Sequence, residues 1–122
     1  MHFSHFGLPV RDERCSRQFY TAYFGFDPAT AQQYEDGTVI IRNADGFDLA
    51  LHRVEHLEPA PPFLHAGFKA AEPADVRALM DRMEADGVTI VERNDETAYV
   101  AFKCLDPDGH RIEVYWEPPC AR

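Results

Sequence analysis

Short stretches in which every second residue is apolar alternate along the chain with two stretches of helical spacing. Residues 3–10 have this alternation and predict a half-buried strand. A helix is predicted next, from Asp12, which can cap its start, to Gly25, which can end it. Three further strands are expected, because strong hairpin signals separate them: residues 30–35, 38–43 and 47–54, with turns at Asp36-Gly37 and Asp45-Gly46.

The same order of elements is predicted again after a proline-rich segment. Residues 55–62, EHLEPAPP, contain three prolines and read as a linker, because proline donates no hydrogen bond to a central strand. A strand, a helix from Pro73 to Gly87 and three more strands follow: residues 63–70, 88–93, 99–105 and 111–116, with turns at Asn94-Asp95 and at residues 106–109. We predict one α+β domain over residues 1–122, made of two βαβββ units (about 1–54 and 63–117) that form a curved mixed sheet.

Net charge and cysteine content limit the cellular compartment and the classes of binding partner that we expect. The net charge is −9 without a cluster of Lys or Arg, which disfavours nucleic acid and anionic membranes as partners. The three cysteines, Cys15, Cys104 and Cys120, form neither an even set nor a CxxC pair, which fits a reducing cytoplasm. The opening residues lack a signal-peptide pattern, and no apolar run approaches the ~20 residues that cross a bilayer. We therefore expect a cytoplasmic protein.

Two histidines and one glutamate are the candidate metal ligands. His5 and His65 each end a Phe-x-His stretch at the start of a unit, and Glu113 interrupts the apolar residues of the closing strand. By alternation all three point to the face away from the helices. Two imidazoles and a carboxylate suit Fe(II), Mn(II), Ni(II) or Zn(II), leave positions open for substrate, and bind more weakly in acid. Taken singly, each also fits a hydrogen-bonded histidine or a solvated glutamate; their matching places in two units favour the metal site.

Three stretches resemble a known family. HFGLPVRDERCSRQFYTAYFGF (residues 5–26), HAGF (65–68) and above all DPDGHRIEV (106–114) are similar to the vicinal oxygen chelate superfamily of glyoxalases, bleomycin-resistance proteins and extradiol dioxygenases. The resemblance implies that family's tandem fold and generally a homodimer. It also implies a divalent metal on His5, His65 and Glu113. Whether the two units pair within one chain or between two chains stays open.

The chain departs from the glyoxalase pattern at the fourth ligand. Relatives of glyoxalase I usually carry a glutamate on the last strand of the first unit, where this chain places Ala50. His52, or Asp48, could replace it only if the register slips by two residues. Tyr115, on the face of Glu113, and also Tyr99 are candidates for donating hydrogen bonds or protons beside the metal, or simply for packing their rings.

Three functions fit these features. The first is a metal-dependent enzyme that chelates vicinal oxygens of a small substrate in lyase, isomerase or dioxygenase chemistry, with Glu113 and Tyr115 as catalytic candidates. The alternative is a metal-free protein that sequesters a drug, as bleomycin-resistance proteins do. A metal-dependent fosfomycin-modifying enzyme ranks last. Binding a phosphonate is expected to require several inward Lys or Arg side chains, and the chain offers chiefly Lys69 and Arg111.

Overall fold

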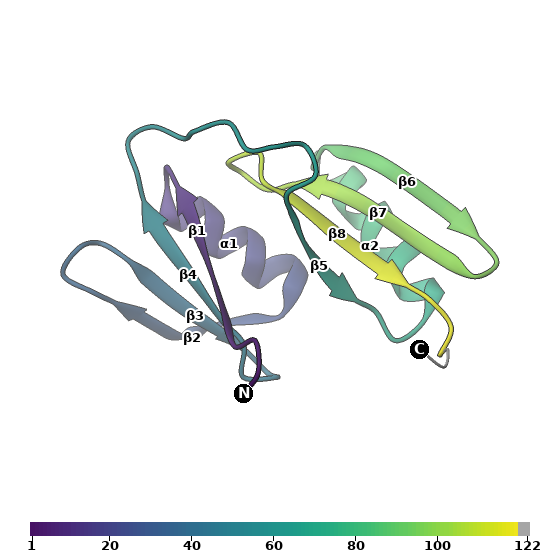
Figure 1. The fold of residues 1–122 in the computed structure, drawn as a ribbon, viewed down its shortest axis with the longest axis horizontal. Coiled ribbons are helices and arrows are strands. Elements are labelled where there is room, and N and C mark those ends of the chain that lie inside the picture. Colours follow the sequence, from purple (N-terminus) through teal and green to yellow (C-terminus); the bar gives the residue numbers. More distant parts are fainter. Residues whose placement is uncertain (120–122) are drawn as a thin grey trace. The chain divides into compact units, whose positions relative to one another are not determined.

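The computed structural model describes residues 1–119 and divides into two compact units, Met1–Pro59 and a second unit that begins at Ala60 (Figure 1). Cys120, one of the three cysteines of the sequence, lies outside the described residues. Each unit contains one helix and one four-stranded mixed sheet, which confirms the α+β fold class. Among the described residues no helix is long and apolar enough to span a bilayer.

The first unit has its sheet order set by one parallel and two antiparallel pairings. Strand β1 pairs in parallel with β4, and β3 pairs antiparallel with both β4 and β2, so the order is β1-β4-β3-β2. Helix α1 packs against β2, β3 and β4. The elements are β1 (His5–Val10), α1 (Glu13–Phe24), β2 (Phe26–Gln33), β3 (Val39–Asn43) and β4 (Asp48–Arg53).

The second unit repeats this arrangement with its own elements. Strand β5 pairs in parallel with β8, and β7 pairs antiparallel with both β8 and β6, so the order is β5-β8-β7-β6. Helix α2 packs against β7 and β8. The elements are β5 (His65–Lys69), α2 (Pro73–Ala85), β6 (Ile90–Glu96), β7 (Tyr99–Leu105) and β8 (Arg111–Trp116).

The first helix begins and ends where the sequence predicts. The Asp12 side chain accepts a hydrogen bond from the backbone N–H of Arg14 at 3.0 Å, which satisfies a donor that the helix leaves open. Gly25 ends the helix with φ of 69°, a left-handed conformation that glycine adopts without a steric penalty.

Each unit has its own core between its helix and its sheet. The alternate residues of the strands that face the helix are buried, together with the inner side of the helix, so burial of apolar surface stabilises each unit. The largest fully buried side chains of the first unit include Tyr20, Phe26, Ile41 and Leu51, and those of the second include Met83, Phe102 and Ile112. The opposite face of each sheet is therefore left for other chemistry.

One predicted turn is wrong. The hairpin between β6 and β7 does not turn at Asn94-Asp95, because Asn94 pairs with Ala101 and Asp95 with Val100, and β6 continues to Glu96. The Arg77 guanidinium also binds both carboxylate oxygens of Asp95, at 3.0 and 2.8 Å, and thereby ties this part of β6 to α2. These contacts outweigh the turn preference of the Asn-Asp pair.

Strand β2 also differs from the prediction, since it begins at Phe26 rather than at residue 30. Its pairing with β3 shifts between Asp27 and Gln32, which marks an irregularity that the alternation of residues 30–35 does not reveal. The predicted turns at Asp36-Gly37 and Asp45-Gly46 are confirmed, with φ of 88° and 80° at the two glycines.

Candidate functional site

His65 and Glu113 meet on the sheet face of the second unit that points away from α2. His65 opens β5, and Glu113 lies on β8 in register with Gly67, two residues beyond His65. Residues two apart on a strand share a face, and paired residues of neighbouring strands do too. The His65 Nε2 atom lies 3.0 Å from Glu113 Oε2, with the two side chains 33% and 15% exposed. Two of the three predicted ligands are therefore adjacent.

A backbone carbonyl orients the His65 ring. Its Nδ1 atom lies 2.8 Å from the carbonyl oxygen of Phe63. Because a carbonyl only accepts, Nδ1 must carry the hydrogen, and Nε2 is then the nitrogen turned to the carboxylate. Two acceptors, a ring lone pair and a carboxylate oxygen, are held together only by a proton or a metal cation. Metal-binding histidines characteristically donate their other nitrogen to a carbonyl or carboxylate, so this donor set fits a divalent cation.

Tyr99 holds the other oxygen of the same carboxylate. Its hydroxyl donates a hydrogen bond to Glu113 Oε1. Burial raises the pKa of Tyr99 above its ordinary value, and the hydrogen bond to Glu113 and that group's charge add to the shift. The phenol therefore stays protonated and remains a donor across the physiological pH range.

Tyr115 takes a different position from Tyr99. Its ring lies against the backbone of β5, so that a Cβ atom added at Gly67 would be 3.5 Å from Tyr115 Cε1. The two tyrosine rings are tilted neighbours with centroids 6.4 Å apart. Tyr115 therefore shares the face of Glu113, as alternation predicts, and Tyr99 shares it too, but the hydrogen bond to the carboxylate comes from Tyr99. The turn length between β6 and β7, which decides the reach of Tyr99, was not readable from the pattern.

His5 belongs to the first unit. It is exposed on β1 and paired with Asp48 of β4, on the sheet face away from α1. The Arg42 guanidinium binds both oxygens of Asp48, at 2.7 and 2.9 Å, and holds the pKa of that carboxyl below its ordinary value, with His5 acting weakly in the same direction. The convergence of His5 with His65 and Glu113 stays a prediction.

Ala50 is the counterpart of Glu113 in the first unit. Gly7 of β1 pairs with Ala50 of β4, as Gly67 of β5 pairs with Glu113 of β8. The register thus places an alanine where the second unit has its carboxylate. His52, the alternative, pairs with Pro9 instead, and its Nδ1 lies 3.1 Å from Thr38 Oγ1.

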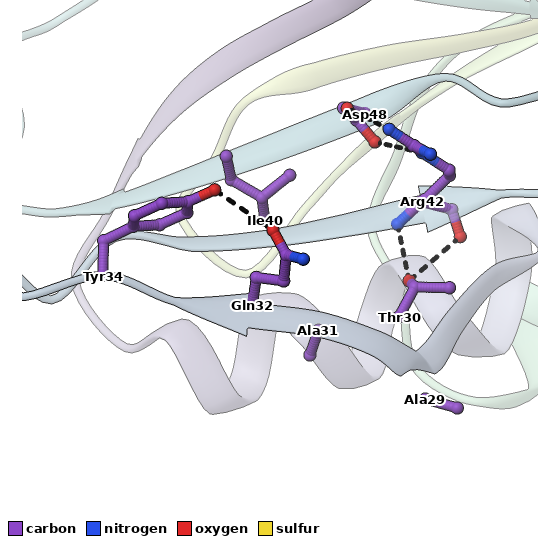
Figure 2. Close-up of a pocket in the computed structure, with 8 residues that line it drawn as sticks. All are labelled: Ala29, Thr30, Ala31, Gln32, Tyr34, Ile40, Arg42 and Asp48. Carbon is purple, nitrogen blue, oxygen red and sulfur yellow. Dashed lines mark hydrogen bonds and ion pairs between the residues drawn. The ribbon is translucent and has the colours of Figure 1, made fainter.

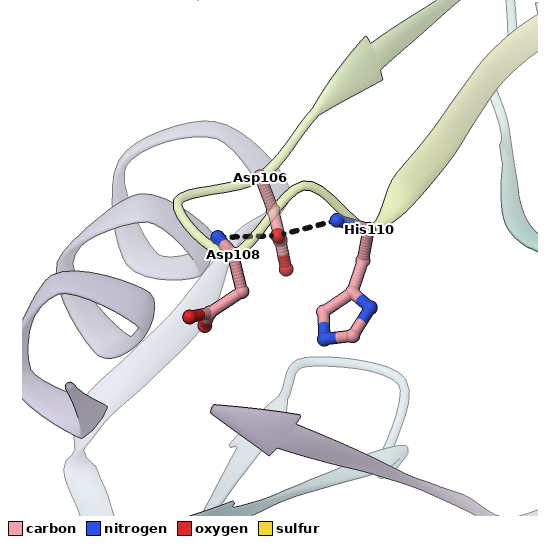
Figure 3. A group of neighbouring side chains, drawn as sticks. All are labelled: Asp106, Asp108 and His110. Atoms are coloured by element: carbon pink, nitrogen blue, oxygen red, sulfur yellow. Dashed lines mark hydrogen bonds between the residues drawn. The ribbon is translucent and has the colours of Figure 1, made fainter. Parts of the chain in front are cut away.

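A second group of ligand-type side chains lies in the turn between β7 and β8 (Figure 3). One ligand atom each of Asp106, Asp108 and His110 lies within 4.8 Å of the others. Asp106 is buried, and its Oδ1 accepts hydrogen bonds from the backbone N–H groups of Asp108 and His110, each at 2.9 Å. Through these two hydrogen bonds Asp106 closes the turn. The sequence motif predicts the turn at residues 106–109 but not the grouping of these three side chains.

The first unit contains a cavity of about 560 Å³ (Figure 2). The Arg42–Asp48 ion pair stands at one end, and at the other the Tyr34 hydroxyl donates to Gln32 Oε1 at 3.1 Å. One of its lining residues, Asp48, is the register partner of His5 on β1. Its lining consists of Ala29, Thr30, Ala31, Gln32, Tyr34, Ile40, Arg42 and Asp48.

Two βαβββ units, the second with a His–Glu pair on its sheet face, are the features by which the chain can be compared with known proteins. The model of the Glyoxalase/Bleomycin resistance protein/Dioxygenase superfamily matches residues 2–114. The chain belongs to this superfamily, which confirms the resemblance noted in its sequence.

Two curated relatives are enzymes. The chain is 29% identical over 115 residues to 3-methylcatechol 2,3-dioxygenase of Pseudomonas putida, a match that covers 90% of this chain and 38% of that enzyme. It is 40% identical over 53 residues to the glutathione transferase FosA of Serratia marcescens, covering 43% of this chain and 36% of FosA. The matches thus span less than two fifths of the length of these curated relatives.

Solved structures match over nearly the whole chain. A possible glyoxalase from Bacillus cereus is 28% identical with a TM-score of 0.79, covering 93% of this chain and 97% of that one. The fosfomycin resistance protein FosX from Listeria monocytogenes, solved with Mn(II) and sulfate, has a TM-score of 0.78, covers 95% of this chain and 90% of its own, and is 18% identical. The likeness to FosX concerns the fold.

Proposed function

We propose that this protein is a metal-dependent enzyme that binds two neighbouring oxygens of a small substrate through a divalent cation. The ligands are His65 and Glu113 of the second unit and His5 of the first. The observation that carries the proposal is the contact of His65 Nε2 with Glu113 Oε2 at 3.0 Å, with Nδ1 committed to the Phe63 carbonyl. Fe(II), Mn(II), Ni(II) and Zn(II) all accept this donor set.

The residues of the site have separable tasks. The Phe63 carbonyl fixes the orientation of the His65 ring, and Glu113 provides the anionic oxygen that neutralises part of a cation's charge. When bound, such a cation supplies Lewis-acid stabilisation of an enolate or alkoxide. Tyr115, on the same face, is the candidate for exchanging a proton with the substrate. The Lys69 side chain is 52% exposed, and its ammonium can orient an anionic group.

An aromatic vicinal diol is the substrate class to test first. The likeness to 3-methylcatechol 2,3-dioxygenase extends over 90% of this chain and therefore includes both units. Ala50, at the counterpart position of Glu113, provides no fourth ligand and so leaves room for two substrate oxygens. Lyase and isomerase reactions on hydroxy-carbonyl compounds are the other members of the test panel, and fosfomycin modification belongs there because of the shorter match to FosA.

A thermal unfolding experiment with added metal tests the proposal. A cation that binds only the folded protein at 100 times its Kd adds about 2.7 kcal/mol of stability, which raises the Tm by several degrees. We expect this rise with at least one of the four cations in the wild type and in His56→Ala, a control that removes an exposed histidine of the linker. His65→Ala and Glu113→Ala should lose it. An unchanged wild-type Tm with all four cations would contradict the proposal.

The cavity of the first unit favours drug sequestration as a second candidate. At about 560 Å³ it falls within the size range of small-molecule sites, and the half-exposed Tyr34 ring offers a surface for stacking. We expect a sequestering protein to bind bleomycin in EDTA and to lose this binding in Tyr34→Ala. Binding that needs metal instead supports the enzyme.

The homodimer and the cytoplasmic location predicted from the sequence also remain proposals. Light scattering during size-exclusion chromatography decides the first, since a dimer doubles the 13.9 kDa mass of the chain. If the protein is instead a monomer, a metal site formed within one chain is the arrangement to test.

A further inference from the structure

We infer that Tyr99 is a positioning residue that leaves Glu113 one oxygen with which to bind a cation. The inference rests on the proposed function, because it concerns the same carboxylate. The hydroxyl of Tyr99 donates to Glu113 Oε1, while Glu113 Oε2 faces His65 Nε2 at 3.0 Å. The two oxygens of the carboxylate therefore have different partners, one a fixed donor and the other the candidate metal-binding ring.

The register explains why Tyr99 reaches this carboxylate. The residue of β7 directly opposite Glu113 is Lys103, and its ammonium lies 2.9 Å from Glu92 Oε2 on the next strand. Tyr99 lies four residues before Lys103 and shares its face of β7. Between them stands Ala101, whose side chain is only a methyl group, so the Tyr99 side chain can pass along the sheet to Glu113.

The hydrogen bond restricts the carboxylate in two ways. It restricts rotation of the Glu113 side chain, which is only 15% exposed. Less conformational entropy of this side chain is then lost when a cation binds. It also occupies Oε1, so a cation at Oε2 receives one oxygen rather than two. Groups that hold the ligands of a metal commonly change its affinity 10- to 100-fold when they are removed.

Metal affinity of single and double variants tests this role. We would titrate Zn(II), and Co(II) as a probe with visible absorption bands, into the wild type, Tyr99→Phe and Tyr115→Phe. Tyr99→Phe removes only the hydroxyl, and we expect roughly a 10- to 100-fold weaker affinity and a changed Co(II) spectrum. Tyr115→Phe keeps a neighbouring ring of the same size and should retain the affinity for both cations. The Tm in EDTA shows whether each variant is folded.

A double-mutant cycle separates positioning from general damage to the fold. In Glu113→Gln the charged ligand is gone, so adding Tyr99→Phe should change Zn(II) affinity less than about twofold if Tyr99 acts through Glu113. An equal loss in both backgrounds would overturn the inference, as would Tyr99→Phe with wild-type affinity and spectrum. In either case a wild type that binds Zn(II) through His65 leaves the proposed function standing. A wild type that binds none of Co(II), Fe(II), Mn(II), Ni(II) and Zn(II) overturns both.

Discussion

Replacement of Asp106 by alanine tests whether the group of Asp106, Asp108 and His110 closes a turn or holds a cation. Asp106 as a residue is 5% exposed, and its Oδ1 accepts hydrogen bonds from two backbone N–H groups, each at 2.9 Å. A hydrogen bond to a charged group contributes roughly 1.5–3 kcal/mol, and water at this partly open turn can replace part of it. We therefore expect Asp106→Ala to lower the free energy of unfolding by about 2–4 kcal/mol.

Urea unfolding followed by tryptophan fluorescence measures this loss. The chain has a single tryptophan, Trp116 on β8, which follows directly from the turn that Asp106 closes. Asp106→Asn is the matched control: its amide oxygen can still accept both N–H groups, so it should lose about 1 kcal/mol or less. Asp108→Ala keeps the backbone N–H that Asp106 binds and should also be mild.

Two results would refute the role of Asp106 in closing the turn. One is an Asp106→Ala variant within 0.5 kcal/mol of the wild type, well below the ~1.5 kcal/mol that a single bond to a charged group contributes. The other is a wild type that EDTA destabilises, with this sensitivity abolished equally by Asp106→Asn and Asp108→Ala, because that pattern identifies a bound cation.

Three further outcomes follow from pKa shifts and close contacts. Since Arg42 holds the pKa of Asp48 below its ordinary value, the stability that wild type has over Asp48→Asn should be present above about pH 4 and disappear as the pH falls through the folded-state pKa, measured by urea unfolding at several pH values. Burial raises the pKa of Cys104 to about 12, so with the other cysteines replaced by serine this thiol should react with a thiol reagent at pH 8 only after unfolding; prompt reaction of the folded protein would contradict this. A Cβ at Gly7 would lie 3.1 Å from His52 Nε2, so Gly7→Ala should lower the Tm, and less so in a His52→Ala background; equal losses would show that another contact is responsible.

The alternation of apolar residues was sufficient to predict the faces of the strands. Parity alone predicts that His65 and Glu113 share one face, and the structure places their side chains in contact. Parity together with the family resemblance predicts Ala50 as the counterpart of a metal ligand, which agrees with its register beside Gly7. Period-two patterning carries this information because a strand has only two faces.

Contacts between strands were harder to predict. The turn at Asn94-Asp95 is wrong because pairing with β7 and the Arg77–Asp95 ion pair extend β6, and neither is visible in local sequence. The bond between Tyr99 and Glu113 depends on that same turn, since a shift of the hairpin would move the tyrosine along the sheet. Whether His5 meets the second unit depends on how the units pair, which no local pattern encodes.

Metal content is the most direct test of the central claim that two imidazoles and a carboxylate bind one divalent cation. The protein would be purified without a His-tag or added metal and analysed by elemental mass spectrometry, beside His5→Ala, His65→Ala and Glu113→Ala, with His56→Ala as the control. We predict close to one divalent ion per chain in the wild type and the control, and a large loss in each of the three ligand variants. Full metal content in all three would contradict the claim, because the ion would then be bound elsewhere.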